Sequence, residues 1–350
     1  MKHTLRHGYT TGACAAAAAK GAALMLRDQA VLREVEIVLP GGERVVFPLH
    51  GQVCSPSQAS CFVIKDAGDD PDITNGAEVH ARVRLSPDVP AERIAIQGGI
   101  GIGRVTKPGL AVPPGEWAIN PVPRRMIAEA VGQVLPRQAV EVEISIPDGT
   151  LRATKTLNER LGIVGGLSIL GTTGIVRPIS AKAWTDTIDA ALDVAKACGC
   201  PQVVLSTGRT SELAVQQRLS LPDEAYIMMG DHVAYALNAC LAHGFKEPLI
   251  ACQFAKLLKI ACGHENTHAA ASELDLQRLR QWGEAAELPA PLVDTIRTAN
   301  TAREIVIASG YDPHLISLVL AQADRAARSH AMALTPRFLL CDYQGRVISL

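Results

Sequence analysis

The sequence has few aromatic residues, almost no net charge and no long uncharged hydrophobic run. Phe, Trp and Tyr make up 4% of its 350 residues, so the core must be built mostly from Ala, Val, Ile and Leu. Its 34 basic residues against 35 acidic ones leave no positive excess to neutralise a phosphate backbone, which argues against nucleic acid as the main partner. No stretch has the roughly 18 strongly apolar residues of a membrane span, so we expect no membrane partner.

The nine cysteines are scattered, and none stands in a CxxC pair. Cys198 and Cys200 form a CxC that lacks the second pair needed for a zinc site. We therefore expect free, buried thiols in a reducing cytoplasm and a cytoplasmic protein. The Ala-rich run near the N-terminus resembles an export signal only superficially, because Lys20 interrupts it and Ala stands where Leu, Ile or Phe would be usual.

The length favours two domains, and the sequence changes its pattern near residue 157. Before that point, apolar and polar residues alternate as in strands, with few helices. The pattern predicts a hairpin of 35–39 with 44–47, a strand over 78–85, a second hairpin of 141–146 with 151–157, and helices over 13–27 and after Pro121. The first part is therefore predicted to be an α+β domain.

After residue 157, short apolar strands are each followed by a small or polar residue and a helix. The pattern predicts strands at 203–205, 226–229 and 249–251, helices at 265–283, 290–308 and 312–333, and a final hairpin of 337–341 with 346–349. Alternating strands and helices are typical of a parallel sheet in an α/β domain, whose ligands bind at the carboxyl ends of the strands.

The segment Gly8–Gly12 leads directly into the Ala-rich helix. Its two hydroxyls, on Thr10 and Thr11, and the free N–H groups of a helix start are suited to binding an anion. The alternative is that the threonines only cap the helix.

Four carboxylates lie within the acidic segment Lys65–Asp72. Carboxylates this close together repel one another unless they bind a cation, contact basic groups or are fully solvated. A solvated turn is one reading. The other is a general acid or base, or an anchor for amide and amine groups, in which Asp66, Asp69 and Asp70 would take part.

The glycine-rich segment Gly98–Arg104 does not fit the GxGxxG frame of a dinucleotide site, and no helix pattern follows it. A backbone surface that approaches a flat ligand closely fits better, with Arg104 and Lys107 available for the acids of that ligand.

The segment His264–His268 reads HENTH and matches the HExxH pattern of zinc hydrolases. On a helix, its two histidines would share a face, with Glu265 as general base and Glu284 or Glu287 as a remote third ligand. The motif stands at the start of its predicted helix, which weakens this hypothesis.

Five segments together resemble one known family. They are Gly8–Gly12, Lys65–Asp72, Ala118–Pro123, Arg160–Gly166 and Ser168–Val176. In this order, and over nearly the whole length, the chain resembles the cobalt-precorrin-5B C1-methyltransferases of the anaerobic route to cobalamin. The family pattern at HENTH is Gly-His-x-Asn-Thr-His, in which Glu265 fills a variable position, so the resemblance removes most of the case for zinc.

The resemblance implies transfer of a methyl group from S-adenosyl-L-methionine to C1 of cobalt-precorrin-5B, giving cobalt-precorrin-6A. The cobalt then belongs to the substrate, and no protein-bound metal is implied. The substrate is a large, flat, polycarboxylate corrinoid, so its site should offer glycine surfaces, hydroxyls, helix N-termini and cationic side chains. We assign its binding to Thr10, Thr11, Asp69, Asp70, Arg104, Lys107, Asn120 and Arg124.

Because the sulfonium is already activated and the ring carbon is electron-rich, alignment should supply most of the rate. A base is still required if a proton is removed from the ring, and Asp66 and His264 are the candidates. The chain lacks the usual glycine-rich loop for S-adenosylmethionine. Because ligands of a parallel sheet bind at the carboxyl ends of its strands, we place this cofactor in the second half. Its expected contacts are Gly171, Thr172, Thr173, Gly174, Thr207, Gly208, Gly230 and Asp231, with Asp231 for the ribose hydroxyls.

The resemblance also suggests the two folds. Residues 1–157 should form a macrocycle-binding α+β domain with a split βαβ arrangement like domain 2 of ribosomal protein S5. Residues 158–350 should form a Rossmann-like α/β domain with a parallel sheet that binds the methyl donor. A zinc hydrolase and a non-catalytic tetrapyrrole carrier are the alternatives, and a homo-oligomer stays open.

Overall fold

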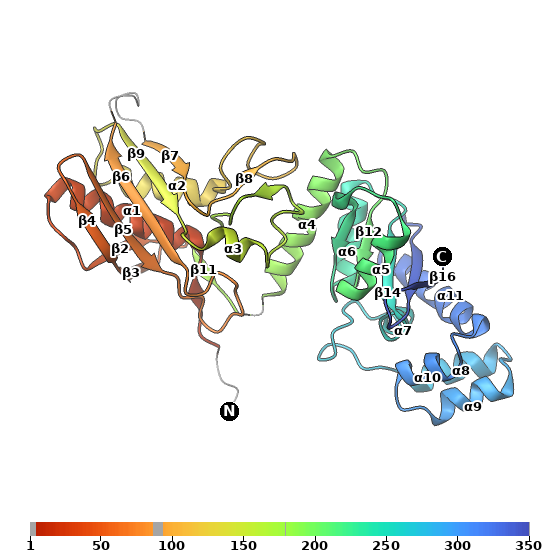
Figure 1. Cartoon of the computed structure of the whole chain (residues 1–350). Helices are drawn as coiled ribbons and strands as arrows, with labels where there is room; N and C mark the ends of the chain where they lie inside the picture. The colour runs from red at the N-terminus through yellow and green to blue at the C-terminus, as the bar shows by residue number, and fades with distance from the viewer. Residues whose placement is uncertain (1–4, 87–93, 179, 350) are drawn as a thin grey trace. The chain divides into compact units, whose positions relative to one another are not determined.

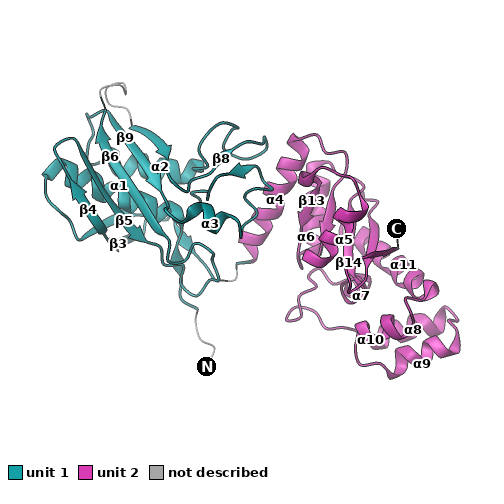
Figure 2. Cartoon of the chain, in the orientation of Figure 1, with its two compact units in different colours: residues 1–180 teal, residues 181–350 magenta. Residues whose placement is uncertain are grey.

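The computed structural model describes residues 5–86, 94–178 and 180–349, and Figure 1 shows its elements. The chain forms two compact units, Met1–Ser180 and Ala181–Leu350 (Figure 2). Their boundary lies later than the expected 157/158, because the following residues pair with the first unit. There β10 (Ile163–Val164) pairs with β8 (Arg104–Val105), and β11 (Ile175–Val176) pairs with β1 (Gly8–Tyr9).

The first unit is built on a five-stranded sheet of order β4-β5-β6-β9-β7. Neighbouring strands are antiparallel except β7 and β9, which are parallel and joined through helix α2. Because β7 and β9 are hydrogen-bonded neighbours, this βαβ unit is not split, contrary to our expectation. The elements are β4 (His50–Cys54), β5 (Gln58–Ile64), β6 (Glu78–Leu85), β7 (Ile94–Gly98), α2 (Pro121–Gly132) and β9 (Val140–Ser145).

One face of this sheet is covered by helices α1 (Thr11–Asp28) and α2 (Figure 1). The Ala-rich stretch of α1 is entirely buried, with every residue from Ala13 to Ala19 at most 1% exposed. Because alanine adds so little bulk, the sheet, α2 and the hairpin after α1 can all approach the helix closely. The run that resembles an export signal is therefore part of the hydrophobic core. The other face of the sheet carries polar pairs such as Arg82 with Glu143.

The first predicted hairpin is confirmed, since β2 (Glu34–Val38) pairs with β3 (Arg44–Pro48). The second is wrong: the residues after β9 form a short helix, α3 (Gly149–Ala153). Both edges of β9 are already paired, with β6 and with β7, so no edge is left for a hairpin partner. In addition, Gly149 lies against Gly101, where a Cβ would be 2.2 Å from the carbonyl oxygen of that glycine.

The second unit contains the predicted parallel sheet, in the order β13-β12-β14-β15-β16. Its first four strands are parallel, and β15 and β16 form the expected final antiparallel pair. Along the chain these are the second, first, third, fourth and fifth strands, so the direction of winding reverses between β12 and β14. The strands are β12 (Val204–Ser206), β13 (Tyr226–Met228), β14 (Leu249–Gln253), β15 (Arg337–Cys341) and β16 (Val347–Ser349).

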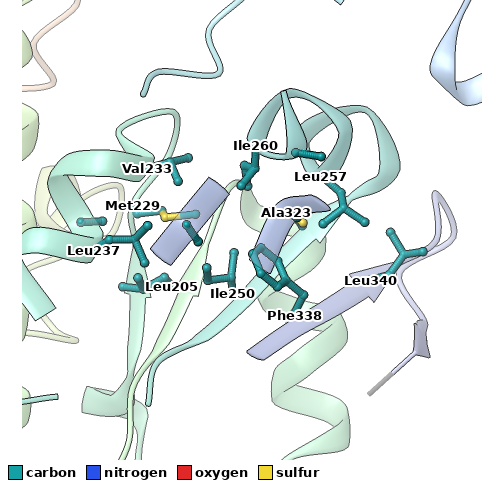
Figure 3. Close-up of a cluster of buried hydrophobic side chains, with 14 of the residues drawn as sticks. Leu205, Met229, Val233, Leu237, Ile250, Leu257, Ile260, Ala323, Phe338 and Leu340 are labelled. Carbon is teal, nitrogen blue, oxygen red and sulfur yellow. The ribbon is translucent and has the colours of Figure 1, made fainter. Parts of the chain in front are cut away.

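Helices cover both faces of this sheet. Val204 on one face belongs to a core with Ala214 of α5, whereas Leu205 and Ile250 on the other face belong to the core shown in Figure 3. Because neighbouring residues of a strand point to opposite faces, adjacent apolar residues serve both cores. The helices include α4 (Ala181–Ala197), α5 (Arg209–Arg218), α6 (Val233–His243), α7 (Phe254–Ala261) and α11 (Pro313–His330), with a 3-10 turn, η1 (Asp223–Ala225).

The predicted helices between residues 265 and 308 are shorter than expected. The structure has α8 (Leu276–Ala285), α9 (Ala290–Thr298) and α10 (Ala302–Ala308). The break before α10 occurs at Thr301, whose side chain caps the new helix by accepting from the N–H of Glu304. All nine cysteines lie in described residues, and six of them are buried. Among the helices of the described residues, none has the length and apolar character to cross a membrane.

Candidate functional site

The sequence contains the motif Thr-Thr-Gly twice, at residues 10–12 and 172–174. The two motifs lie side by side in the first unit, because β1 pairs with β11. Thr10 caps α1, its Oγ1 accepting from the N–H of Ala13 over 3.2 Å. Thr11 Oγ1 accepts from the N–H of Leu170 over 3.0 Å. Both threonines are buried. The hydroxyls that we expected to meet an anion are therefore engaged within the chain.

The segment Gly171–Gly174, expected beside the methyl donor in the second half, belongs to the first unit. A Cβ on its first glycine would lie 2.4 Å from the Cβ of Thr10, and one on its last glycine 2.7 Å from Cδ2 of Leu39. These glycines let the loop pack tightly against the start of α1 and the β2–β3 hairpin. Thr172 and Thr173 remain exposed.

The acidic segment holds Arg6 in place. The Arg6 guanidinium pairs with both oxygens of Asp66, and the backbone N–H of Arg6 donates to Asp69 Oδ2 over 2.7 Å. Asp70 is partly buried in the same loop. The hydrogen bond from Arg6, together with that from the N–H of Gly68, lowers the pKa of Asp66. A carboxylate with a lowered pKa is a weaker base, so this geometry counts against Asp66 as a proton acceptor.

Sequence reasoning missed the buried ion pair at the ends of this segment. Lys65 Nζ lies 2.6 Å from Asp72 Oδ2, and the Lys65 side chain is 1% exposed. The signal was present, because Cys61, Val63 and Lys65 occupy the inward-facing positions of β5 and its extension. The thiol of Cys14 is close by, and burial raises its pKa to about 12, so it is inert.

The glycine-rich segment 98–103 does not present an open backbone surface. A Cβ on Gly98 would lie 2.6 Å from Trp117, and one on Gly101 would lie 1.9 Å from the carbonyl oxygen of Ile146. The chain itself fills the space over these glycines, contrary to our expectation that a flat ligand approaches them. The exposed residue Arg104 stacks on Trp117, with Cζ 3.8 Å from the ring centre, and its Nη1 donates to a backbone carbonyl over 2.6 Å.

The other polar residues assigned to the macrocycle make local contacts in the same unit. Lys107 Nζ donates to the carbonyl oxygen of Arg160 over 3.2 Å, and Arg124 Nη1 donates to that of Ile96 over 3.1 Å. Asn120 stands at the start of α2, where its side chain makes no capping hydrogen bond. All three are partly buried.

In the second unit, the carboxyl ends of β12 and β13 meet as expected. The carbonyl oxygen of Ser206 accepts from the N–H groups of Met229 (3.0 Å) and Gly230 (3.2 Å). The structure therefore brings Thr207, Gly208, Gly230 and Asp231 together. Gly208 caps α5 without a side-chain hydrogen bond, and a Cβ there would meet no atom within 4 Å. The start of α5 is thus open, at the point where the winding of the sheet reverses.

Asp231, which follows Gly230 at the carboxyl end of β13, is the centre of a polar cluster. Its Oδ1 accepts from Lys256 Nζ, and from Thr267 Oγ1 over 2.6 Å. Burial works to raise the pKa of Asp231, but the hydrogen bonds from Lys256 and Thr267 outweigh it and lower the pKa. Lys259 Nζ donates to the carbonyl oxygens of Thr267 (3.1 Å) and Ser272 (2.8 Å). Burial, with the nearby charge of Lys256, lowers the pKa of Lys259.

Sequence reasoning singled out Asp231 but missed the two lysines of α7 and the buried side chain of Thr267. The available signal was spacing, because Lys256 and Lys259 lie three residues apart on a helix that begins directly after β14.

The HENTH segment is not helical. The backbone N–H of His264 donates to the carbonyl oxygen of Lys259 over 3.2 Å, and His268 Nδ1 accepts from the N–H of Ala270 over 3.1 Å. The two histidines therefore do not share a helix face, as the zinc hypothesis requires. Within residues 5–86, 94–178 and 180–349, no group of three or more His, Cys, Asp and Glu side chains is placed to hold a metal ion.

A groove of about 480 Å³ lies between α1, α2 and the β2–β3 hairpin, and none of the residues assigned above lines it. Its lining mixes apolar groups such as Ile37 and Met126 with the charged groups of Lys20, Arg125 and Glu129. Lys20 Nζ donates to a backbone carbonyl of β2 over 2.9 Å, so this charge is partly satisfied within the chain.

Residues 1–178 match the family model described as CbiD, and residues 266–349 match that of the CbiD C-terminal domain. A cobalt-precorrin-5B C(1)-methyltransferase from Pelobacter propionicus is 61% identical over 98% of this chain and 95% of its own length. One of the same name from Geobacter sulfurreducens is 60% identical over 98% of both chains. The crystal structure of a cobalamin biosynthesis protein (cbiD) from Archaeoglobus fulgidus is 28% identical, covers 79% of this chain and 84% of its own, and gives a TM-score of 0.40.

Proposed function

The chain belongs to the CbiD family, and from this premise we propose that it methylates C1 of cobalt-precorrin-5B in cobalamin biosynthesis. The observation that carries the proposal is identity of 60% and above, across 98% of the chain, to relatives that bear this activity in their names. The cobalt enters as part of the substrate.

The methyl donor in this proposal is S-adenosylmethionine. Its C–S bond breaks as the C–C bond to the ring forms, and S-adenosylhomocysteine leaves. The donor binds at the carboxyl edge of the parallel sheet, beside Thr207 and Gly208. The open start of α5 supports this placement, because the N–H groups of a helix start and the helix dipole suit the donor's carboxylate. Both side-chain bonds that Asp231 accepts in the described part of the chain fall on Oδ1, so its Oδ2 is available to a ribose hydroxyl.

The macrocycle binds the first unit, where Arg104 is the exposed cation closest to the glycine-rich segment. Thr10, Thr11 and the residues 171–174 shape this surface by their internal bonds and packing, and Lys107, Asn120 and Arg124 line it. For removal of a ring proton we prefer His264 to Asp66, because Arg6 stabilises the charged form of that aspartate. In this proposal the second unit is Rossmann-like. The order of its strands supports this, because the direction of winding reverses between β12 and β14. The first unit lacks the split βαβ arrangement, and for the rest of its fold we retain the likeness to domain 2 of ribosomal protein S5 as a proposal.

The direct test is an anaerobic assay of the purified protein with S-adenosylmethionine and cobalt-precorrin-5B. We expect S-adenosylhomocysteine to form only when the macrocycle is present, and without added zinc. A tetrapyrrole carrier would bind the macrocycle and release no S-adenosylhomocysteine. A zinc hydrolase would hold stoichiometric metal and lose its activity on chelation. Either result would overturn the proposal.

A further inference from the structure

Three exposed aliphatic side chains of the first unit stand on three different segments, namely the turn after β7, helix α3 and strand β10. Ile100 is 73% exposed, Leu151 is 69% exposed and Val164 is 49% exposed. Single exposed hydrophobic residues are ordinary on protein surfaces, but a contiguous group of them marks an interaction site.

The three segments meet where three glycines are in contact. A Cβ on Gly149 or on Gly166 would lie 2.2 Å from the carbonyl oxygen of Gly101, so the three backbones are in direct contact. Ile100 is one residue from this junction, and Leu151 and Val164 are each two residues from it. The three aliphatic side chains therefore extend from segments whose backbones touch one another.

Hydrogen bonds hold the three segments in a fixed arrangement. The N–H of Ile146 donates to the carbonyl oxygen of Ile100 over 2.8 Å, and the N–H of Leu167 donates to that of Gly101 over 2.9 Å. Thr150 Oγ1 donates to the carbonyl oxygen of Gly165 over 2.8 Å. A surface that is ordered before binding costs less conformational entropy when a ligand arrives.

A cation lies beside this apolar surface. Val164 is the register partner of Arg104 in the β10–β8 pair. The guanidinium is stacked on Trp117, and among the described residues its one hydrogen bond, from Nη1, goes to the carbonyl oxygen of Gly115. Its remaining N–H groups can therefore bind a carboxylate.

We propose that one face of the macrocycle rests on the apolar patch of Ile100, Leu151 and Val164, with a peripheral carboxylate bound to Arg104. This inference rests on the proposed function. A flat ring system with an apolar face and an acidic rim complements a firm aliphatic surface with a cation at its edge. The glycines allow the three segments to approach one another. The side chains beside the glycines, and not the glycine backbone, then contact the macrocycle.

The test compares a triple variant, Ile100→Ser/Leu151→Ser/Val164→Ser, with a matched control, Val31→Ser/Val46→Ser/Val53→Ser. The control side chains are 62%, 51% and 62% exposed in the same unit. Because all six side chains are exposed, both variants should unfold at the same urea concentration as the wild type. The probe for binding is cobyrinic acid, a stable corrinoid with a carboxylate rim, and turnover is measured with cobalt-precorrin-5B.

We expect the patch variant to raise the Kd of cobyrinic acid and the KM of cobalt-precorrin-5B by about tenfold or more. The KM of S-adenosylmethionine should stay unchanged, and the control variant should behave as the wild type. Arg104→Ala should weaken binding of cobyrinic acid and reduce its dependence on salt.

Normal turnover by the patch variant, with an unchanged KM for the macrocycle, would overturn this inference and leave the proposed function intact. So would an equal loss in the control variant, or a patch variant that changes only the oligomeric state. If the wild type itself transfers no methyl group to the macrocycle, the proposed function fails, and the inference fails with it.

Discussion

Removing the charge of Asp72 should destabilise the first unit more than removing the charge of its partner Lys65. The ammonium of Lys65 is 1% exposed and Asp72 is 22% exposed, so Asp72→Asn leaves a fully buried charge without its counter-charge. We expect this change to lower the free energy of unfolding by about 2–4 kcal/mol. In Lys65→Met, the carboxylate keeps its contact with water and its hydrogen bonds from Thr74, so the loss should be about 1–2 kcal/mol.

The same pair sets a pH dependence. Burial alone would raise the pKa of Asp72, but the charge and hydrogen bond of Lys65 and the bonds from Thr74 outweigh it and lower the pKa. A carboxylate whose pKa is lower in the folded state stabilises the fold fully above its unfolded pKa of about 3.9 and loses this contribution as pH falls through the folded value. The gap in stability between wild type and Asp72→Asn should therefore be widest above about pH 5 and shrink below it.

Urea unfolding followed by fluorescence measures both effects. Trp117 is the sole tryptophan of the first unit, so a background with Trp184→Phe and Trp282→Phe reports on that unit alone. The double variant Lys65→Met/Asp72→Asn should cost less than the sum of the single changes, because neither charge is left unpaired. Additive costs, or a larger loss for Lys65→Met than for Asp72→Asn, would refute the reasoning.

Three further predictions concern single residues. Gly8→Ala should lower the free energy of unfolding by about 2–4 kcal/mol, because a Cβ there would lie 2.0 Å from the carbonyl carbon of Ala67. Gly41→Ala, with no atom within 4 Å, should change it by less than about 0.5 kcal/mol, both measured by urea unfolding. Gly208→Ala should leave stability unchanged but raise the KM of S-adenosylmethionine in steady-state assays, because the added methyl group narrows the open start of α5. His264→Gln should lower kcat about tenfold or more in the same assays, whereas an unchanged kcat would exclude this base.

Local patterns predicted much of the framework. Alternation placed β6 correctly at Glu78–Leu85, and the capping threonine with its Ala-rich run located α1 to within two residues at each end. The alternation of strands, turns and helices in the second half correctly predicted a parallel sheet. The predicted final pair is also confirmed, since β15 pairs with β16. In each case, the residues that determine the element lie within or next to it.

Tertiary contacts decided the rest. Residues 151–157 alternate like a strand, yet contact between Gly149 and Gly101 and the paired edges of β9 direct the chain into α3. HENTH was expected at the start of a helix, but Asp231, 36 residues earlier, holds Thr267 in an irregular loop. The segment 171–174 was assigned to the second half by its position in the sequence, whereas pairing of the following strand, β11, with β1 holds it in the first unit. No local pattern reveals a partner that is distant in sequence.

The most direct test of the central claim is to find where the transferred methyl group goes. Purified protein is incubated without oxygen with cobalt-precorrin-5B and S-adenosylmethionine carrying a ¹³C-labelled methyl group, and the product is analysed by mass spectrometry and NMR. We predict a single labelled methyl group, bound to C1 of the macrocycle, with an equal amount of S-adenosylhomocysteine. A label at another carbon, or an unmodified macrocycle in the presence of folded protein, would contradict the account.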